Sequence, residues 1–303
     1  MLTTAAVMVV LAQATPGAAA RAASTARVDC AAGRERTTVW DRARAPEVMR
    51  YCDFLAHAEA RLPGEPRRAA ESAEAAGNLL PGQVAPRILR ARAALGMGQP
   101  KVALPLLEEA LKLDPEALSR DARAQLAMAV SLRDTGATAR AVDAYRALVP
   151  RIDALPGEER GRARLDAALA LTMATPPAMG EAVALLREGA EQGPAALQAV
   201  ARAVLALVLE RTGAREEANA QAEQARRGGA MTALGTPDRG PIGWSAEALA
   251  VGAKLREASD PAGAASAWEA YAARAPQGPW AAQAQKRAGE LRRGGGGRAK
   301  GAK

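Results

Sequence analysis

The sequence predicts an all-α fold, an α-solenoid of about six antiparallel helical hairpins with a capping helix at the C-terminal end. Hydrophobic residues form 49% of the 303 residues but aromatic residues only 3%, so alanine supplies much of the apolar fraction. That composition suits closely packed helices and does not suit a β-sandwich. A turn former recurs with an alanine five positions after it, and a proline closes four of the six units. Because each hairpin of such an array packs only on its neighbours, the length does not require two globular domains.

The clearest unit spans residues 86–115 (PRILRARAALGMGQPKVALPLLEEALKLDP). We predict a first helix at about residues 87–97, a turn at Gly98–Pro100 and a second helix at about residues 101–113. Pro115 then ends the second helix, because proline has no amide donor and disfavours a helical residue before it. The rest of the chain repeats this unit with insertions.

Small residues align the hairpins. Two antiparallel helices approach closely only where side chains are small. The aligned alanines of the second helices are Ala69, Ala103, Ala141, Ala182, Ala218 and Ala264. The residues four positions later are Ala73, Leu107, Tyr145, Leu186, Ala222 and Trp268. The turns fall at Gly64, Gly98, Gly136, Pro177, Gly213 and Ser259. The matching small positions of the first helices are Ala91, Ala129, Ala170, Ala206 and Gly252, with His57 in that place in the first hairpin.

This unit resembles a tetratricopeptide repeat (TPR). That family has a small residue in its first helix, an Ala-x-x-x-Phe pair in its second and a closing proline. Here Ala91 takes the small position, Ala103 and Leu107 take the pair, and Pro115 closes the unit, whereas Arg90 departs from the preferred leucine. The resemblance covers about residues 46–292. It implies a right-handed superhelix whose first helices line a groove that binds another protein.

Residues 1–20 have the layout of a secretory signal peptide. An apolar run from Ala5 to Ala12 is followed by small residues up to Ala20, although nothing before the run is basic. The run is too short to span a bilayer, which takes ~20 residues. We therefore predict a periplasmic or secreted protein without a transmembrane segment. A disordered start or a wrongly assigned first codon, with a cytoplasmic protein, is the open alternative.

Residues 21–45 are predicted to form an extended arm that carries Cys30. The other cysteine is Cys52, in the first predicted helix, residues 46–62. In an exported protein, two cysteines indicate one disulfide. Two unlinked thiols, one of them buried, are the alternative.

Two further stretches stand outside the hairpins. Residues 227–243 are rich in glycine and proline and are predicted to form a loop, after which Trp244 begins the next helix. The helix at residues 279–292 is predicted to cap the array. Residues 293–303 form a glycine-rich basic tail that we predict to be disordered. The basic residues of this tail could make weak contact with nucleic acid or another anionic polymer. The alternative is that the tail only increases the solubility of the protein.

The residue inventory predicts no enzyme and no cofactor. His57 is the one histidine, and no glycine-rich stretch lies between a strand and a helix to hold phosphate. One metal site is conceivable, with Cys30, Cys52, Asp53 and His57 as its ligands. A hydrogen-bonded structural histidine is the favoured interpretation of His57, so we predict no metal site.

The resemblance to TPR proteins places a set of first-helix residues toward the groove. They are Ile88, Arg92, Arg123, Leu126, Val130, Arg133 and Arg164. Arginine suits carboxylates because its donors form a planar fork. The sequence thus predicts a non-catalytic scaffold for protein–protein interaction, which is either located in the cell envelope or secreted. The alternatives are a cytoplasmic adaptor whose basic tail contacts nucleic acid or acidic partners, and, for the arginines, a merely solvated helix face.

Overall fold

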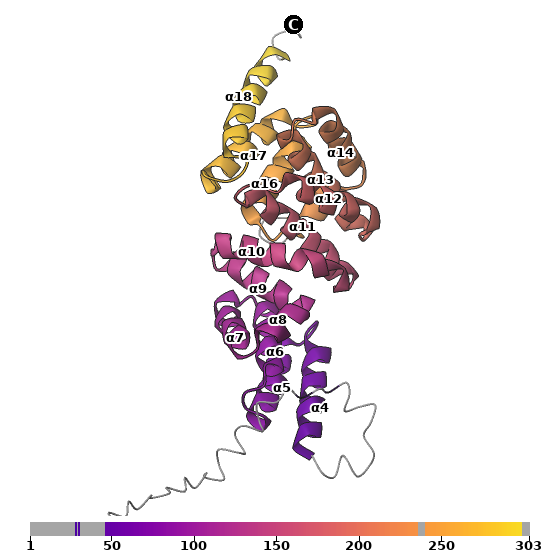
Figure 1. The fold of residues 1–303 in the computed structure, drawn as a ribbon. Coiled ribbons are helices and arrows are strands. Elements are labelled where there is room, and N and C mark those ends of the chain that lie inside the picture. The colour runs from indigo at the N-terminus through magenta and orange to yellow at the C-terminus, as the bar shows by residue number, and fades with distance from the viewer. Residues whose placement is uncertain (1–27, 29, 31–45, 236–239, 299–303) are drawn as a thin grey trace, which may run out of the picture. The chain divides into compact units, whose positions relative to one another are not determined.

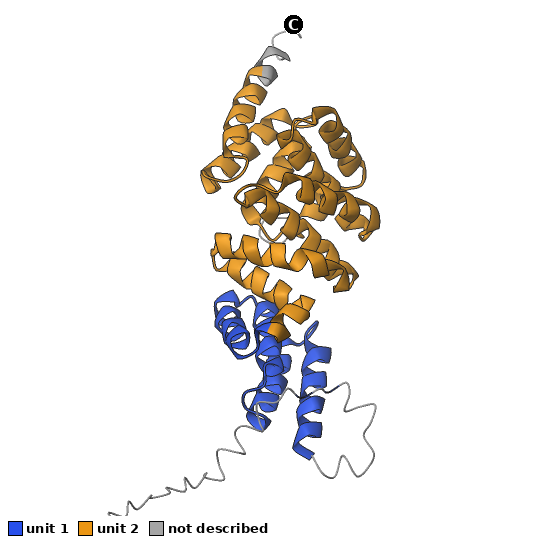
Figure 2. Cartoon of the chain, viewed as in Figure 1, with its two compact units in different colours: residues 1–115 blue, residues 116–303 orange. Residues whose placement is uncertain are grey.

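A computed structural model describes residues 28, 30, 46–235 and 240–298, the last five of these by backbone alone. These residues form helices and contain no strand. The chain divides into two compact units, residues 1–115 and 116–303 (Figure 2). Each unit is described by itself. The predicted signal peptide, residues 1–20, lies outside the described residues.

The first unit consists of two helical hairpins (Figure 1). Its helices are α4 (Pro46–Arg61), α5 (Pro66–Leu79), α6 (Ala85–Gly96) and α7 (Pro100–Leu113). Each helix packs against the next one along the chain, and α6 also touches α4. Prolines at the start of α5, α6 and α7 fix the first turn, where their missing amide costs no hydrogen bond.

The second unit continues the same pattern with four hairpins and a last helix. Its helices, beginning at the junction, are α8 (Pro115–Arg120), α9 (Ala122–Asp134), α10 (Thr138–Leu148), η1 (Val149–Ala154), α11 (Gly157–Met173), α12 (Met179–Gln192), α13 (Ala195–Arg211), α14 (Arg215–Arg227), α15 (Ala230–Leu234), α16 (Ser245–Arg256), α17 (Pro261–Arg274) and α18 (Ala281–Arg298). The hairpins pair α9 with α10, α11 with α12, α13 with α14 and α16 with α17. Helix α18 packs against α17 and is the predicted capping helix.

The predicted alignment of the hairpins is confirmed. All six aligned alanines of the second helices are 0% exposed. The residues four positions later are buried as well, and so are the small residues of five first helices. The helices therefore cross where the sequence places its small side chains.

The first hairpin departs from this alignment. His57 is exposed, and its neighbour Ala58 is the buried residue. An imidazole in the close-packed position would lose its water, whereas a methyl group loses nothing. The turn also differs, because the Glu65 amide bonds to the Arg61 carbonyl at 2.8 Å and Gly64 is not left-handed. The prediction that His57 takes the small, close-packed position of the first hairpin was therefore wrong.

Glycine is required in three of the other turns. Gly98, Gly136 and Gly213 have φ values of 70°, 82° and 87°, a region that side chains disfavour. After the first of them, the Gln99 amide bonds to the Ala94 carbonyl at 2.9 Å, which closes the helix end in a Schellman motif. The turn signals in the sequence thus have a conformational cause.

The stretch predicted as a loop, residues 227–243, is only partly a loop. It contains α15, and its last part is packed, since Ile242 is 2% exposed and Trp244 is 7% exposed. Helix α18 also extends past Arg292, its predicted end, to Arg298. Glycine is a poor helix former, so the composition does not predict this extension. Residues 299–303 lie outside the described part.

The predicted disulfide is confirmed. Cys30 is bonded to Cys52 of α4, with Cα atoms 5.5 Å apart. Val28 and Cys30 pack against a buried cluster that includes Tyr51 and Ala76, and the Val28 amide donates to the Gln83 side chain at 3.3 Å. Both sulfurs are thus engaged with each other, and the described residues contain no group of three or more His, Cys, Asp or Glu side chains suited to a metal ion.

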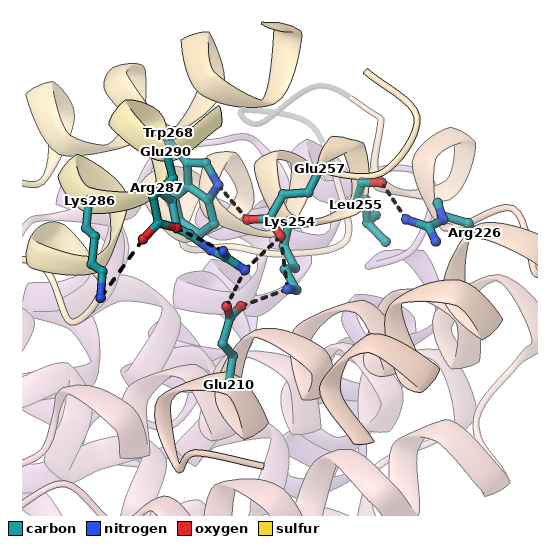
Figure 3. A network of polar contacts seen from close by, with 9 residues as sticks. All are labelled: Glu210, Arg226, Lys254, Leu255, Glu257, Trp268, Lys286, Arg287 and Glu290. Carbon is teal, nitrogen blue, oxygen red and sulfur yellow. Dashed lines mark hydrogen bonds and ion pairs between the residues drawn. The ribbon is translucent and has the colours of Figure 1, made fainter. Parts of the chain in front are cut away.

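A buried charge network attaches the capping helix to the second unit (Figure 3). Lys254, whose side chain is 3% exposed, lies 2.8 Å from Glu210 of α13 and 3.0 Å from Glu257. Arg287 of α18 lies 2.8 Å from Glu210, and the Trp268 indole donates to Glu257 at 3.1 Å. Each buried charge has an opposite charge beside it, which offsets its desolvation. The network therefore joins α13, α16, α17 and α18.

Candidate interaction surface on helices α9 and α11

One face of α9 carries four of the residues predicted to line the groove. Arg123, Leu126, Val130 and Arg133 follow at intervals of three, four and three residues, which places them on one side of a helix. Leu126 and Val130 are half-buried. Asp121 sets the start of this helix, because its carboxylate accepts the Arg123 amide at 2.9 Å.

Two ion pairs join this face to α11. The Arg123 Nε atom lies 3.3 Å from a carboxylate oxygen of Glu159. The Arg133 guanidinium pairs with Asp166, whose side chain is buried at 8% exposure, and the Arg133 side chain is 11% exposed. The α9–α11 face, defined by Arg123, Leu126, Val130, Arg133 and Asp166, is thus bridged at both ends with an aliphatic strip between.

Arg133 is the centre of a buried polar cluster. It donates to the Tyr145 hydroxyl at 3.0 Å and to Asp134 at 2.7 Å, besides its pair with Asp166. Burial lowers the pKa of Arg133, but the nearby Asp166 and its other partners raise it by more, so the guanidinium stays charged. Burial also raises the pKa of Asp166, which Arg133 opposes. Burial raises the pKa of Tyr145 well above its ordinary value, so the phenol stays neutral.

Residues from a distant part of the chain complete the cluster. The Gly243 amide donates to Asp166 Oδ1 at 2.8 Å, and the Trp244 indole donates to the Asp166 carbonyl at 3.0 Å. The Trp244 ring lies 6.0 Å from the Tyr145 ring. A Cβ atom on Gly243 would overlap the Arg133 guanidinium. The chain's own segment, Ile242–Trp244, therefore occupies the end of the face that was predicted to bind a partner.

Arg164 does not present a free guanidinium to a groove. Its side chain is 3% exposed and pairs with Asp153 at 2.6 Å and with Glu188 of α12 at 3.3 Å. Residues 163–172 of α11 are buried without exception, so this part of the helix is covered on all sides. The sequence missed this because an arginine followed by buried neighbours has no distinct pattern of its own.

The two predicted groove residues of the first unit lie on α6. Ile88 is 6% exposed and belongs to the core. Arg92 pairs with Glu59 of α4 at 3.0 Å, and its side chain is 14% exposed. Among the predicted groove residues, the structure therefore brings Arg123, Leu126, Val130 and Arg133 together on one surface.

No family model matches the chain, and no curated protein matches it. Among solved structures, the chain is similar to one described as a MamA RS-1 ArsTM double mutant, with 15% identity over 59% of this chain and 94% of that chain, at a TM-score of 0.46. It is also similar to the TPR-like repeats of a putative kinesin light chain from Podosopora anserina. A single-substitution form of those repeats has 23% identity over 62% of this chain and 97% of that one, at a TM-score of 0.44. A second structure of those repeats has 23% identity, covers 59% and 95%, and has a TM-score of 0.43.

The packing within the chain itself defines the architecture. Six hairpins each bury the aligned alanine of the second helix, and three of their turns have the left-handed glycine that the sequence places there. The chain is an array of TPR-like hairpins.

In this TPR-like array, the α9 residues were predicted as groove residues, but the residues that contact them were not named. Asp166, Tyr145, Gly243 and Trp244 were not predicted as site residues. The sequence did contain a signal for Trp244. Aromatic residues form only 3% of the chain, so a tryptophan directly after a glycine- and proline-rich stretch indicates a side chain that packs against the rest of the fold. Among the described residues, no helix is long and apolar enough to cross a membrane.

Proposed function

We propose that this TPR-like array is a non-catalytic scaffold that binds another protein through the α9–α11 face. The observation that carries the proposal is the pair of half-buried aliphatic side chains, Leu126 and Val130, between two interhelical ion pairs. Helices held in this way present a surface that needs little ordering on binding. Apolar side chains with charged residues around them are the usual composition of such a site.

Charge contributes less to this binding than the aliphatic strip. Arg123 has a side chain 39% exposed and is paired with Glu159, so a partner carboxylate competes for a guanidinium that is already engaged. Exposed ion pairs contribute about 0–1 kcal/mol each, whereas a micromolar partner needs roughly 8 kcal/mol. Leu126 and Val130 are already half-buried, so their complete burial adds about 1.5–3 kcal/mol between them, and further contacts with the partner must supply the rest. Binding should therefore weaken only moderately with salt.

We also propose that the protein is exported to the periplasm or secreted. The Cys30–Cys52 disulfide supports this, because disulfides persist in oxidising compartments. The alternative is a cytoplasmic adaptor that contacts acidic partners through its basic tail. Intact-mass measurement on native protein separates the two: export predicts loss of about the first 20 residues, and retention of Met1 contradicts it.

Site-specific cross-linking tests the scaffold proposal. A photo-reactive residue at Arg123, beside the aliphatic strip, should trap a discrete partner in the producing cells. Changing Leu126 and Val130 together to glutamate should abolish that product while the helical circular-dichroism spectrum stays intact. Arg146→Glu, at an exposed position of α10, is the matched control and should leave the product unchanged. Equal cross-linking by the double variant and the wild type would contradict the proposal.

A further inference from the structure

The segment Ile242–Trp244 lies on the α9–α11 face without being part of a helix. Trp244 has extended backbone angles, with φ −87° and ψ 90°. The side chains of Ile242 and Trp244 are buried, at 2% and 7% exposure, and both Gly243 and Trp244 donate to Asp166 of this face. Gly243 lies 77 residues after the Asp166 that accepts its amide.

The contacts define a recognition chemistry. The Asp166 carboxylate accepts a peptide amide, and the Asp166 carbonyl accepts an indole N–H. The Arg133 guanidinium fills the space where any side chain on Gly243 would go, and Asp166 holds it there. Tyr145 packs beside the indole ring. A surface with these groups selects an extended segment in which glycine precedes tryptophan, because a Cβ at the first position would force Arg133 away from Asp166.

We propose that Ile242–Trp244 is an internal ligand in a peptide-binding site formed by Arg133, Tyr145 and Asp166, and that a partner docks by inserting an extended Gly-Trp segment in its place. This inference rests on the proposed scaffold function, because it names the partner chemistry of the same face. Val130, which belongs to the aliphatic strip, lies three residues before Arg133 on α9, so a segment in this site is continuous with the strip.

The internal segment competes with any partner. A tethered segment acts at an effective concentration of about millimolar for a short flexible connection, so a partner has to exceed that advantage. The wild-type chain should therefore bind a free peptide weakly, and a chain whose own segment no longer fits should bind the same peptide at least tenfold more tightly.

Peptide binding to the full-length chain tests this. The chain variant is Gly243→Val with Trp244→Ser, which substitutes none of Arg133, Tyr145 and Asp166 and makes the internal segment too large for the site. Serine at position 244, the N-cap of α16, is a favourable residue for starting a helix. The probe is a fluorescently labelled peptide with the sequence of residues 240–248, GPIGWSAEA. Fluorescence anisotropy should show at least tenfold tighter binding to this variant than to the wild type.

Two controls make the result specific. The same peptide with alanine in place of its second glycine should lose at least tenfold in affinity, and so should the original peptide when the chain variant also carries Asp166→Asn. Equal affinity for variant and wild type, or no binding to a variant that keeps its helical spectrum, overturns the inference. In that event a partner cross-link that depends on Leu126 and Val130 would still support the scaffold function, so the two failures are distinguishable.

If the variant does not fold, hydrogen exchange on the wild type tests whether the internal segment can leave its site. Displacement requires local opening, so the segment at 240–244 should exchange at least tenfold faster than residues 163–172 of α11. Equal protection of the two stretches overturns the inference.

Discussion

Asp166 of α11 accepts the backbone amide of Gly243 at 2.8 Å across 77 residues of chain. The same aspartate pairs with Arg133 of α9 and accepts the Trp244 indole through its carbonyl. A single buried carboxyl group thus joins two hairpins to the segment that leads into a third.

Loss of the Asp166 carboxylate should be strongly destabilising. Asp166→Ala removes the acceptor of the Gly243 amide and the buried carboxylate beside Arg133, which keeps only Tyr145 and the more exposed Asp134. Breaking a buried pair from one side costs about 3–5 kcal/mol. Urea unfolding followed by circular dichroism measures the loss. Asp143→Ala, at an exposed position of α10, should change the free energy of unfolding by less than about 0.5 kcal/mol. Similar losses in the two variants would contradict the assigned role.

Glu247 should make the stability depend on pH near neutrality. This carboxyl group of α16 is 5% exposed, and burial raises its pKa from 4.5 to about 7. A raised folded-state pKa means that the folded protein binds the proton more tightly than the unfolded chain does. Its contribution to the free energy of unfolding is therefore most favourable below pH 4.5 and falls as the pH rises to about 7. The full cost above that range is up to about 3 kcal/mol.

The Glu247→Gln variant isolates this contribution. It should be more stable than the wild type at pH 8, and the difference should shrink as the pH falls toward 5. Glu216→Gln, on the exposed surface of α14, serves as the control and should show no such trend. A difference between Glu247→Gln and wild type that stays constant from pH 5 to pH 8 would rule out the raised pKa.

The buried alanines should tolerate no larger side chain. Ala182 of α12 is 0% exposed, whereas Ala184 of the same helix is exposed. Ala182→Leu inserts three carbon atoms where two helices cross, and overpacking of this kind costs about 1–3 kcal/mol. Ala184→Leu keeps the helix propensity similar and adds no packing conflict. Thermal unfolding of the two variants should separate them, and equal midpoints would refute the packing at Ala182.

Reduction of the disulfide should destabilise the first unit. Cys30 and Cys52 are 22 residues apart in the sequence, and closing a loop of this length contributes about 3 kcal/mol by restricting the unfolded chain. Native protein should take up an alkylating agent at two sites only after reduction, as intact mass would show. Alkylation of both thiols in unreduced protein would show that the bond is absent, and an unchanged unfolding midpoint after reduction would show that it does not stabilise the fold.

The sequence predicted the hairpins well because their determinants are local. A left-handed glycine such as Gly136 and a small residue such as Ala141 five positions later each have one structural meaning, and both were placed correctly. His57 was misplaced because the turn at Gly64 is built differently, and that depends on backbone angles that residue type does not determine.

The site was harder to predict because its determinants are distant in the chain. The resemblance to TPR repeats placed Arg123, Leu126 and Val130 toward the groove, and in the structure all three are partly exposed on one side of α9. The spacing could not show that Arg133 would be covered by Gly243, since no local pattern relates residues of α9 to a segment after α15. Their role in binding a partner remains a prediction.

A double-mutant cycle between Asp166 and Gly243 tests the central claim most directly. The claim is that the segment before α16 is seated on the α9–α11 face through Asp166 and Arg133. Gly243→Ala should destabilise the wild type, because the new Cβ displaces the Arg133 guanidinium from Asp166. In an Asp166→Asn background that ion pair is already lost, so the same change should cost less, with a coupling energy of about 0.5–3 kcal/mol. Additive effects of the two substitutions on the free energy of unfolding, within about 0.3 kcal/mol, would contradict the account.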